Sequence, residues 1–188
     1  IPRFTSSRSI TSDRKTYVQI TQELSEDKVR NEFVMEDVKA AIQKGRTPLV
    51  LTTRTAHVRV LAQMLMPFTD HVIQLIGADS AKEKRLALQN LQSIPTSESL
   101  VIVATGKYVG EGFDYPRLDT LFLVSPVSWK GIVAQYAGRL HREYHGKTDV
   151  RIYDYIDIHL PLCDRMYRRR LKGYAAIGYQ LLEKGVLV

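Results

Sequence analysis

Two arginines and a glutamine recur at helical spacing near residue 140. Gln135, Gly138, Arg139 and Arg142 spell the pattern Q-x-x-G-R-x-x-R. Positions three and four apart share one face of a helix, so the glutamine and both arginines point roughly the same way. A guanidinium group stays charged and presents a planar fork of donors that fits phosphate oxygens. The pattern therefore suits a grip on a phosphoryl group, although a solvated basic helix face fits the spacing about equally well.

A glycine-rich stretch, TGKYVGEGFD, lies upstream at residues 105–114. Its glycines, Gly106, Gly110 and Gly112, permit tight turns and leave backbone N–H groups free to face phosphates. Thr105 ends a run that suits a strand, and its hydroxyl could donate to a nucleic-acid phosphate. A connection without any ligand is one alternative. A dinucleotide-binding loop is a poor alternative because the third glycine of G-x-G-x-x-G is missing.

These stretches resemble a known family. Residues 105–114 are similar to motif V, residues 118–120 to the segment after it, and residues 135–142 to motif VI of the second RecA-like domain of superfamily 2 helicases and translocases. The sequences GRLHR and YDYID further resemble DEAD/DEAH-type helicases related to type III restriction enzymes and the TOTE conflict systems. The resemblance runs from about residue 46 to about residue 179.

The resemblance implies nucleotide-related roles for six residues. Arg139 and Arg142 would be arginine fingers that reach the γ-phosphate of ATP, and Gln135 would help to place the attacking water or the phosphate. The residues that would couple the nucleotide to the nucleic-acid strand are Gly110, Glu111 and Asp114. The two acidic residues of this set could equally hold the loop through bonds to backbone N–H groups.

The resemblance also implies a track for nucleic acid, formed by Thr53, Arg54, Gly77, Thr105, Gly106 and Lys107. Thr53 and Arg54 stand at the position of motif IV, and Gly77 begins a loop after a predicted strand. A Thr-Arg pair at the end of a strand caps the next helix, without contacting nucleic acid, about as often as it contacts it.

One half of the expected ATP site is absent from the sequence. It contains no phosphate loop and no Asp-Glu pair of the Walker B type. The Gly-Lys-Thr at 146–148 mimics part of a phosphate loop, but the first glycine would fall at His141, so we interpret it as a turn. In the helicases that the chain resembles, an N-terminal RecA-like domain supplies those parts and the magnesium ligand. We therefore expect ATP with Mg²⁺ to need that partner domain, and this chain alone to be inactive.

Apolar runs and segments of helical period alternate along the chain. Strands are predicted at residues 17–20, 47–54, 72–77, 100–104, 120–124 and 150–156, and helices at 26–44, 56–66, 80–92, 131–141 and 162–182. This order predicts an α/β fold with a doubly wound, mostly parallel sheet and helices on both faces. The resemblance implies the RecA-like, P-loop NTPase-type arrangement of a helicase C-terminal domain.

In such sheets ligands bind at the carboxyl ends of the strands. Arg54, Gly77, Thr105 and Ser125 each follow or end a predicted strand, so we expect them to gather on one rim. We divide the chain into a linker or frayed entry at 1–16, the RecA-like domain at 17–159 and a basic helical extension at 160–188. The arginines of this extension either contact nucleic acid or are solvated, while Leu162, Met166 and Tyr174 pack on the sheet.

Composition limits the partners and the compartment. Lys and Arg number 27 against 20 Asp and Glu, a net charge of +7, which favours a polyanion such as DNA, with RNA as an alternative. The single cysteine excludes an internal disulfide framework, and Asp157-x-His159 has too few ligands for a metal site. No apolar stretch is long enough to span a membrane, so we expect a cytoplasmic protein. The Ile-Pro start suggests a fragment of a larger protein.

The leading interpretation is the second motor domain of an ATP-dependent DNA helicase or translocase in bacterial defence, restriction or repair. One alternative is a non-enzymatic nucleic-acid-binding module of the same fold. The other is a nucleotide-cofactor enzyme with a Rossmann-like sheet, which the missing glycine disfavours.

Overall fold

The continuous apolar runs form the centre of one sheet. In the computed structural model, which describes residues 1–5, 10, 15–110, 113–128, 133–183 and 186–187, the strands β2 (Pro48–Thr52), β4 (Leu100–Thr105) and β5 (Thr120–Leu123) are buried along their whole length. Burial on both faces is typical of strands in parallel sheets covered by helices. β3 (His71–Leu75) pairs with β4, and β6 (Arg151–Ile156) pairs with β5. The order is β1-β6-β5-β2-β4-β3, and every pair is parallel.

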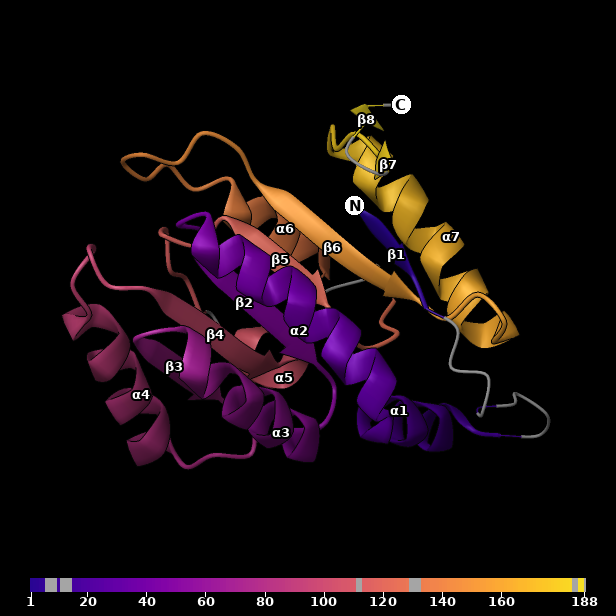
Figure 1. The fold of residues 1–188 in the computed structure, drawn as a ribbon, viewed down its shortest axis with the longest axis horizontal. Helices are drawn as coiled ribbons and strands as arrows, with labels where there is room; N and C mark the ends of the chain where they lie inside the picture. Colours follow the sequence, from indigo (N-terminus) through magenta and orange to yellow (C-terminus); the bar gives the residue numbers. More distant parts are fainter. Residues whose placement is uncertain (6–9, 11–14, 111–112, 129–132, 184–185, 188) are drawn as a thin grey trace.

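Alternate residues of each strand face opposite layers of helices. Leu49 and Leu51 of β2 belong to a core with α4 (Ala81–Ser93), α5 (Gly106–Gly110) and α6 (Ala134–Leu140). Val50 belongs to the opposite core, with α2 (Lys28–Gln43) and α3 (Thr55–Leu65). A 3₁₀ turn, η1 (Met66–Phe68), follows α3. The predicted doubly wound α/β sheet with helices on both faces is confirmed, and Figure 1 shows α2 crossing in front of the sheet and α6 behind it.

The predicted strand at residues 17–20 is wrong, because these residues begin the helix α1 (Tyr17–Glu26). Thr16 caps this helix: its hydroxyl accepts from the N–H of Gln19, and the Gln19 side chain accepts from the N–H of Thr16. This capping box was visible as Thr-x-x-Gln in the sequence. The predicted strand covered only residues 17–20, and four residues are too short a window to separate a period of 2 from one of 3.6.

Residues 2–4, which we assigned to a linker, form the edge strand β1 (Pro2–Phe4). The strand pairs with β6, with Pro2 opposite Asp154 and Phe4 opposite Ile156. Proline is tolerated there because an edge strand has one side without ladder bonds. A three-residue strand whose partner lies at the other end of the chain leaves no local signal.

The C-terminal extension contains the helix α7 (Pro161–Ala176), which lies alongside β1 in Figure 1. It ends earlier than predicted because Gly178 adopts a left-handed φ of 81°, and a short hairpin of β7 (Leu182–Glu183) and β8 (Val186–Leu187) follows. Among the described residues, no helix is both long and apolar enough to cross a lipid bilayer.

Candidate nucleotide and nucleic-acid interface

The helix α6 buries one side and presents the predicted phosphate-gripping residues on another. Tyr136, Ala137 and Leu140 are buried in the core beneath the sheet, whereas Gln135 and Gly138 are exposed. This division follows from the 3.6-residue period, which separates the two sets around the helix. The predicted helix at 131–141 is thus confirmed for residues 134–140.

Arg139 is half-buried and holds the segment that follows β4. Its Nη1 atom donates to the carbonyl oxygen of Val109 at 2.9 Å and to that of Phe113 at 2.6 Å. Val109 lies in the last turn of α5, whose final carbonyls have no partner within the helix. Arg139 therefore ties α6 to both sides of the loop between α5 and Phe113.

Arg142 lies just beyond α6 and pairs with Asp114 at 3.3 Å between Nη2 and Oδ2. The two side chains are 63% and 39% exposed. An ion pair this exposed is worth only about 0–1 kcal/mol, so Arg142 can exchange Asp114 for another anion at little cost. The structure thus brings together Asp114 and Arg142, from the stretches that resemble motif V and motif VI.

Lys147 supports the same corner and was missed as a site residue. Its ammonium group donates to the carbonyl oxygens of Pro116 (2.6 Å), Leu140 (3.0 Å) and Arg142 (2.8 Å). Partial burial lowers the pKa of Lys147, against the opposing effect of Asp119 and Asp114. The turn interpretation of residues 146–148 is confirmed, because Gly146 has a φ of 83°. No local pattern around this turn indicates that its lysine points back at residues 140–142.

A pocket of about 420 Å³ lies on the rim at the carboxyl ends of β2 and β4. It brings together four residues of the predicted nucleic-acid track, Thr53, Thr105, Gly106 and Lys107, and Tyr17 and Met166 also line it. The Thr105 hydroxyl accepts the N–H of Gly77 at 2.9 Å, so its own hydrogen remains available to a phosphate. Gly77 lies against Lys107, since a Cβ on Gly77 would stand 2.8 Å from the Lys107 Cβ.

Arg54 lines a neighbouring pocket of about 470 Å³ with Asn31, His57 and Met64. The predicted gathering of Arg54, Gly77, Thr105 and Ser125 on one rim agrees with the structure: the Thr105 hydroxyl accepts from the N–H of Gly77, and the Ser125 hydroxyl accepts from the N–H of Thr53, next to Arg54. Glu111 lies outside the described residues, and Gly110 is the last residue of α5.

Beneath the rim runs a buried chain of hydrogen bonds that the sequence analysis did not identify. Thr52 Oγ1 lies 2.9 Å from His57 Nδ1 and 2.9 Å from Ser125 Oγ, and His57 Nε2 lies 2.9 Å from Asn31 Oδ1. Burial, with the charges of Arg30 and Arg54, lowers the pKa of His57 to about 3. His57 is therefore neutral at physiological pH, and it connects the ends of β2 and β5 to α2.

The residues after β5 are held from three directions. Tyr17 donates its hydroxyl to the carbonyl of Pro126 at 2.8 Å, Arg30 donates to that of Val124 at 2.7 Å, and Arg170 donates to that of Val127. The three donors come from α1, α2 and α7. These residues lead toward α6, so the N-terminal helices and the C-terminal helix brace the approach to motif VI.

The two arginines of this brace are buried and paired. Arg30 lies 3.2 Å from Asp157, and Arg170 binds Asp154 with two bonds of 2.7 and 2.8 Å. We expected the arginines of the C-terminal helix to be exposed, either solvated or on nucleic acid, and this is wrong for Arg170. A buried guanidinium requires a carboxylate partner, and Asp154 provides it from β6.

Known proteins resemble the chain in sequence and in fold. No family model matches the chain. Curated relatives are poxvirus proteins named transcript termination protein A18: the chain is 27% identical to that of Yaba-like disease virus over 143 residues, which is 73% of the chain and 29% of the relative. For the vaccinia virus (strain Ankara) protein the identity is 28% over 131 residues, 69% of the chain and 26% of the relative. The chain therefore spans less than a third of these relatives.

Solved structures agree on the arrangement of the elements. T4 UvsW matches with a TM-score of 0.69 and 20% identity over 93% of the chain and 38% of that protein. The C-terminal part of the Fun30 ATPase domain matches with 0.56, at 16% identity over 75% and 47%. The Mss116p DEAD-box helicase domain 2, bound to an RNA duplex, matches with 0.52, at 12% identity over 83% and 54%. The chain has the RecA-like α/β fold of helicase domains.

Proposed function

We propose that the chain is the second motor domain of an ATP-dependent helicase or translocase. Arg139 and Arg142 would complete an ATP site formed with an N-terminal RecA-like domain, and Gln135 would line the same cleft. The rim pocket would carry part of the nucleic-acid track. The RecA-like fold of the chain, and its resemblance to motifs V and VI at α5 and α6, support this proposal.

The observation that carries the proposal is the position of α5 between the rim pocket and Arg139 of α6. Lys107, in its first turn, and Thr105, the residue just before it, line the rim pocket, and Val109, near its end, is held by Arg139. Five residues of helix span only about 7.5 Å. Any movement of the arginines would therefore reach the nucleic-acid side through one short rigid element.

The exposed pair of Arg142 and Asp114 provides a switch for that movement. When ATP is bound between the domains, its γ-phosphate offers Arg142 a stronger partner than the Asp114 carboxylate, because a guanidinium binds phosphate oxygens through a planar fork. Asp114 would then be released from Arg142, while Arg139 still holds the carbonyls of Val109 and Phe113. After hydrolysis the pair would form again, and the rim would return to its first position.

The missing domain would supply the phosphate loop and the Mg²⁺ ligand. Among the described residues, no group of three or more His, Cys, Asp or Glu side chains is placed to hold a metal ion. Phosphoryl transfer depends on positioning and on charge stabilisation, to which an arginine finger contributes a factor of ~10³–10⁵ only when the rest of the site exists. The exposed Arg142 suits that contribution from the second domain.

The substrate is proposed as DNA or RNA. The net charge of +7 favours either polyanion, and the likeness to a transcript termination protein and to a domain bound to an RNA duplex gives RNA added weight. A role in restriction or repair rests only on the resemblance of the GRLHR and YDYID sequences.

ATP hydrolysis by this chain and by the longer protein that contains it tests the proposal, with and without single-stranded DNA, duplex DNA and RNA. We expect no hydrolysis by the chain alone, and hydrolysis by the longer protein that at least one nucleic acid stimulates. A longer protein that stays silent with all of them would contradict the proposal, and so would a chain that hydrolyses ATP by itself.

One observation favours a second candidate, a non-enzymatic nucleic-acid-binding module. Both arginines already have partners inside the chain, Arg139 at two carbonyls and Arg142 at Asp114. In that case α6 would only brace α5 beneath the rim. Nucleic-acid binding without any ATP hydrolysis by the longer protein would favour this candidate.

A further inference from the structure

The helix α7 carries exposed basic residues outside its buried face. At 100° per residue, its buried residues cluster on one side of the helix: Cys163, Tyr167, Arg170, Gly173 and Tyr174. Asp164 and Arg168 form an ion pair at 2.8 Å, and Arg168 lies about 200° around the helix from Met166. Toward Met166 lie the exposed Arg169 and Arg165, and the exposed Lys172 lies between Arg165 and Arg168 around the helix. We refer to Arg165, Arg169 and Lys172 as the basic flank.

The basic flank begins at the rim pocket. Met166 lines that pocket together with Thr53, Thr105 and Lys107. Arg165 is its neighbour, and Arg169 lies one turn further along the same side of α7. Lys172 lies six residues from Met166, about 9 Å along the axis. Positive charge therefore continues from Lys107 across the pocket onto α7. Of the three residues of the basic flank, Lys172 lies furthest from the pocket.

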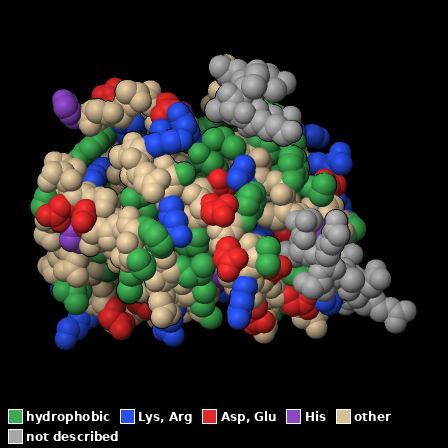
Figure 2. Space-filling model, in the orientation of Figure 1, with side chains coloured by type: hydrophobic (Ala, Val, Ile, Leu, Met, Phe, Trp, Pro, Cys, Tyr) green, Lys and Arg blue, Asp and Glu red, His purple; other side chains and the backbone are tan. Residues whose placement is uncertain are grey.

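The charges of the basic flank are not neutralised within the described part of the chain. Neither Arg165, Arg169 nor Lys172 forms an ion pair there, whereas Arg168, on the side of α7 away from Met166, has Asp164. The face of the molecule that carries α2 is different, because Figure 2 shows its basic side chains interleaved with acidic and apolar ones. A cluster of unpaired arginines on one helix flank is suited to bind an anion.

The buried face holds the basic flank in a fixed position relative to the rim. Arg170, on the buried face, binds Asp154 of β6 and the carbonyl of Val127. Tyr17 binds the carbonyl of Pro126, the residue before Val127, and Tyr17 also lines the rim pocket. The helix backbone that carries Arg165 and Arg169 is therefore fixed relative to the pocket, so no movement of α7 is needed for both to be used together.

We propose that Arg165 and Arg169 extend the nucleic-acid track beyond the rim pocket by binding the phosphates of the strand that crosses it. This inference rests on the proposed nucleic-acid function and adds a contact surface to it. The two arginines are four residues apart, about 6 Å along the helix, which corresponds to about two nucleotides at 3.4 Å per nucleotide along one strand. Their guanidinium groups bind phosphate without reading bases, so the contact is independent of sequence.

The salt dependence of binding to a fluorescent single-stranded 30-mer DNA tests the inference, measured on this chain and on the longer protein. The logarithm of the association constant falls with the logarithm of the KCl concentration, with a slope of about −0.7 per phosphate contact. We expect the double variant R165A/R169A to make the slope shallower by about 1.4. K172A should change it less, because Lys172 lies further from the pocket.

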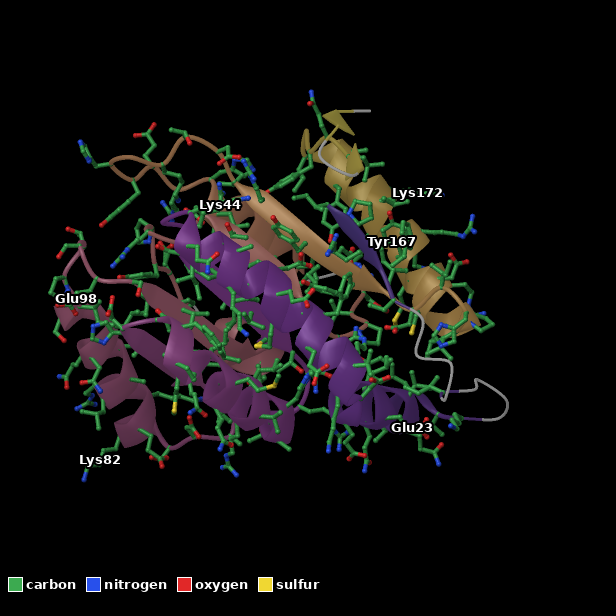
Figure 3. The ribbon with its side chains drawn as sticks, in the orientation of Figure 1. Glu23, Lys44, Lys82, Glu98, Tyr167 and Lys172 are labelled. Atoms are coloured by element: carbon green, nitrogen blue, oxygen red, sulfur yellow. The ribbon has the colours of Figure 1, made fainter. Side chains whose placement is uncertain are left out.

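A matched control is R168A/K82A, which removes the same two charges. Arg168 is already paired with Asp164 and lies about 200° around the helix from the pocket residue Met166, and Figure 3 labels Lys82 on α4 at the far end of the molecule from Lys172. This control should leave the slope at the wild-type value. All four side chains are exposed, so the thermal midpoints of both double variants should stay close to that of the wild type.

K107A separates this inference from the proposed function. If K107A reduces the slope and R165A/R169A does not, the basic flank is not part of the track, although the rim pocket is. If R168A/K82A reduces it as much as R165A/R169A, the effect is one of net charge and the inference is overturned. If the wild type shows no salt-dependent binding in either protein, both the inference and the nucleic-acid function fail.

Discussion

The Nη1 atom of Arg139 lies 2.6 Å from the carbonyl oxygen of Phe113, so motif VI holds the far end of motif V directly. A second bond from the same atom reaches Val109 in α5. The first residues of α5 line the rim pocket. The predictions below follow from this connection and from the buried polar contacts that surround it.

Substitution G77A should disturb the rim, because the new methyl group would stand 2.8 Å from the Lys107 Cβ, an atom close to the backbone. Either Lys107 or α5 must move. We expect a loss of about 1–3 kcal/mol in the free energy of unfolding, as for an overpacked site. Chemical denaturation measures it, and unchanged stability together with unchanged DNA binding would contradict the close contact.

Substitution G138A is the matched control, since nothing lies within 4 Å of the position that its Cβ would occupy. Alanine inside a helix is favoured over glycine by roughly 0.5–1 kcal/mol, so this variant should be slightly more stable than the wild type. If the N-terminal domain packs against motif VI, ATP hydrolysis by the longer protein should nevertheless fall. Unchanged hydrolysis would place the partner domain elsewhere.

Substitution R170M should be strongly destabilising, because it leaves Asp154 buried without its partner. Removal of one member of a buried pair costs about 3–5 kcal/mol. R168M removes an arginine from the exposed pair with Asp164 and should cost about 0–1 kcal/mol. Thermal unfolding compares the two, and equal shifts would show that the Arg170 pair contributes no more than a surface contact.

The neutral state of His57 predicts a loss of stability in acid. Its pKa is about 3 in the folded protein and 6.5 when unfolded, so the unfolded chain binds the extra proton between these values. The stabilisation is fully present above pH 6.5 and is lost progressively as the pH falls toward 3. At about 1.4 kcal/mol per pH unit, the loss from this residue between pH 7 and pH 5 is about 2 kcal/mol.

The variant H57Q keeps a donor and an acceptor but does not titrate. The difference in unfolding free energy between pH 7 and pH 5 should therefore be about 2 kcal/mol smaller for H57Q than for the wild type. Urea unfolding at the two pH values measures both. The same pH dependence in the two proteins would mean that His57 is not buried in a neutral state.

Lys147 is predicted to position Arg142 rather than to contact a ligand. K147M removes the donor to the carbonyls of Leu140, Arg142 and Pro116, so the turn beyond α6 should loosen. In the longer protein we expect kcat for ATP hydrolysis to fall by tenfold or more while the KM for ATP changes little. K147R, which keeps a donor, should recover part of kcat. A change confined to the thermal midpoint would indicate a structural role only.

The sheet and the rim could be predicted because their signals are local. Continuous apolar runs such as residues 100–104 predict buried strands, and a residue that follows such a run must lie on the carboxyl rim. Arg54, Gly77, Thr105 and Ser125 are placed in this way. The positions of Thr53 and Lys107 in the track, and the roles of all these residues, depend on the family resemblance.

The contacts that link the motifs could not be predicted, because they join residues far apart in the chain. Arg170 looks like its exposed neighbours in the sequence, and only Asp154 on β6 explains its burial. In the sequence Lys147 looks like an ordinary turn residue, and only the structure shows its three carbonyl partners. The helix α5 begins and ends with glycine, so its residues have poor intrinsic helix propensity and tertiary packing must stabilise it.

The most direct test of the central claim is the rate of ATP hydrolysis by the longer protein at saturating nucleic acid, compared between wild type and R142A. Arg142 is 63% exposed and its pair with Asp114 is weak, so R142A should leave the thermal midpoint unchanged. R151A, which removes an arginine from another exposed pair, is the control. We expect a fall of ~10³-fold or more for R142A and none for R151A. A rate for R142A within tenfold of the wild type would contradict it.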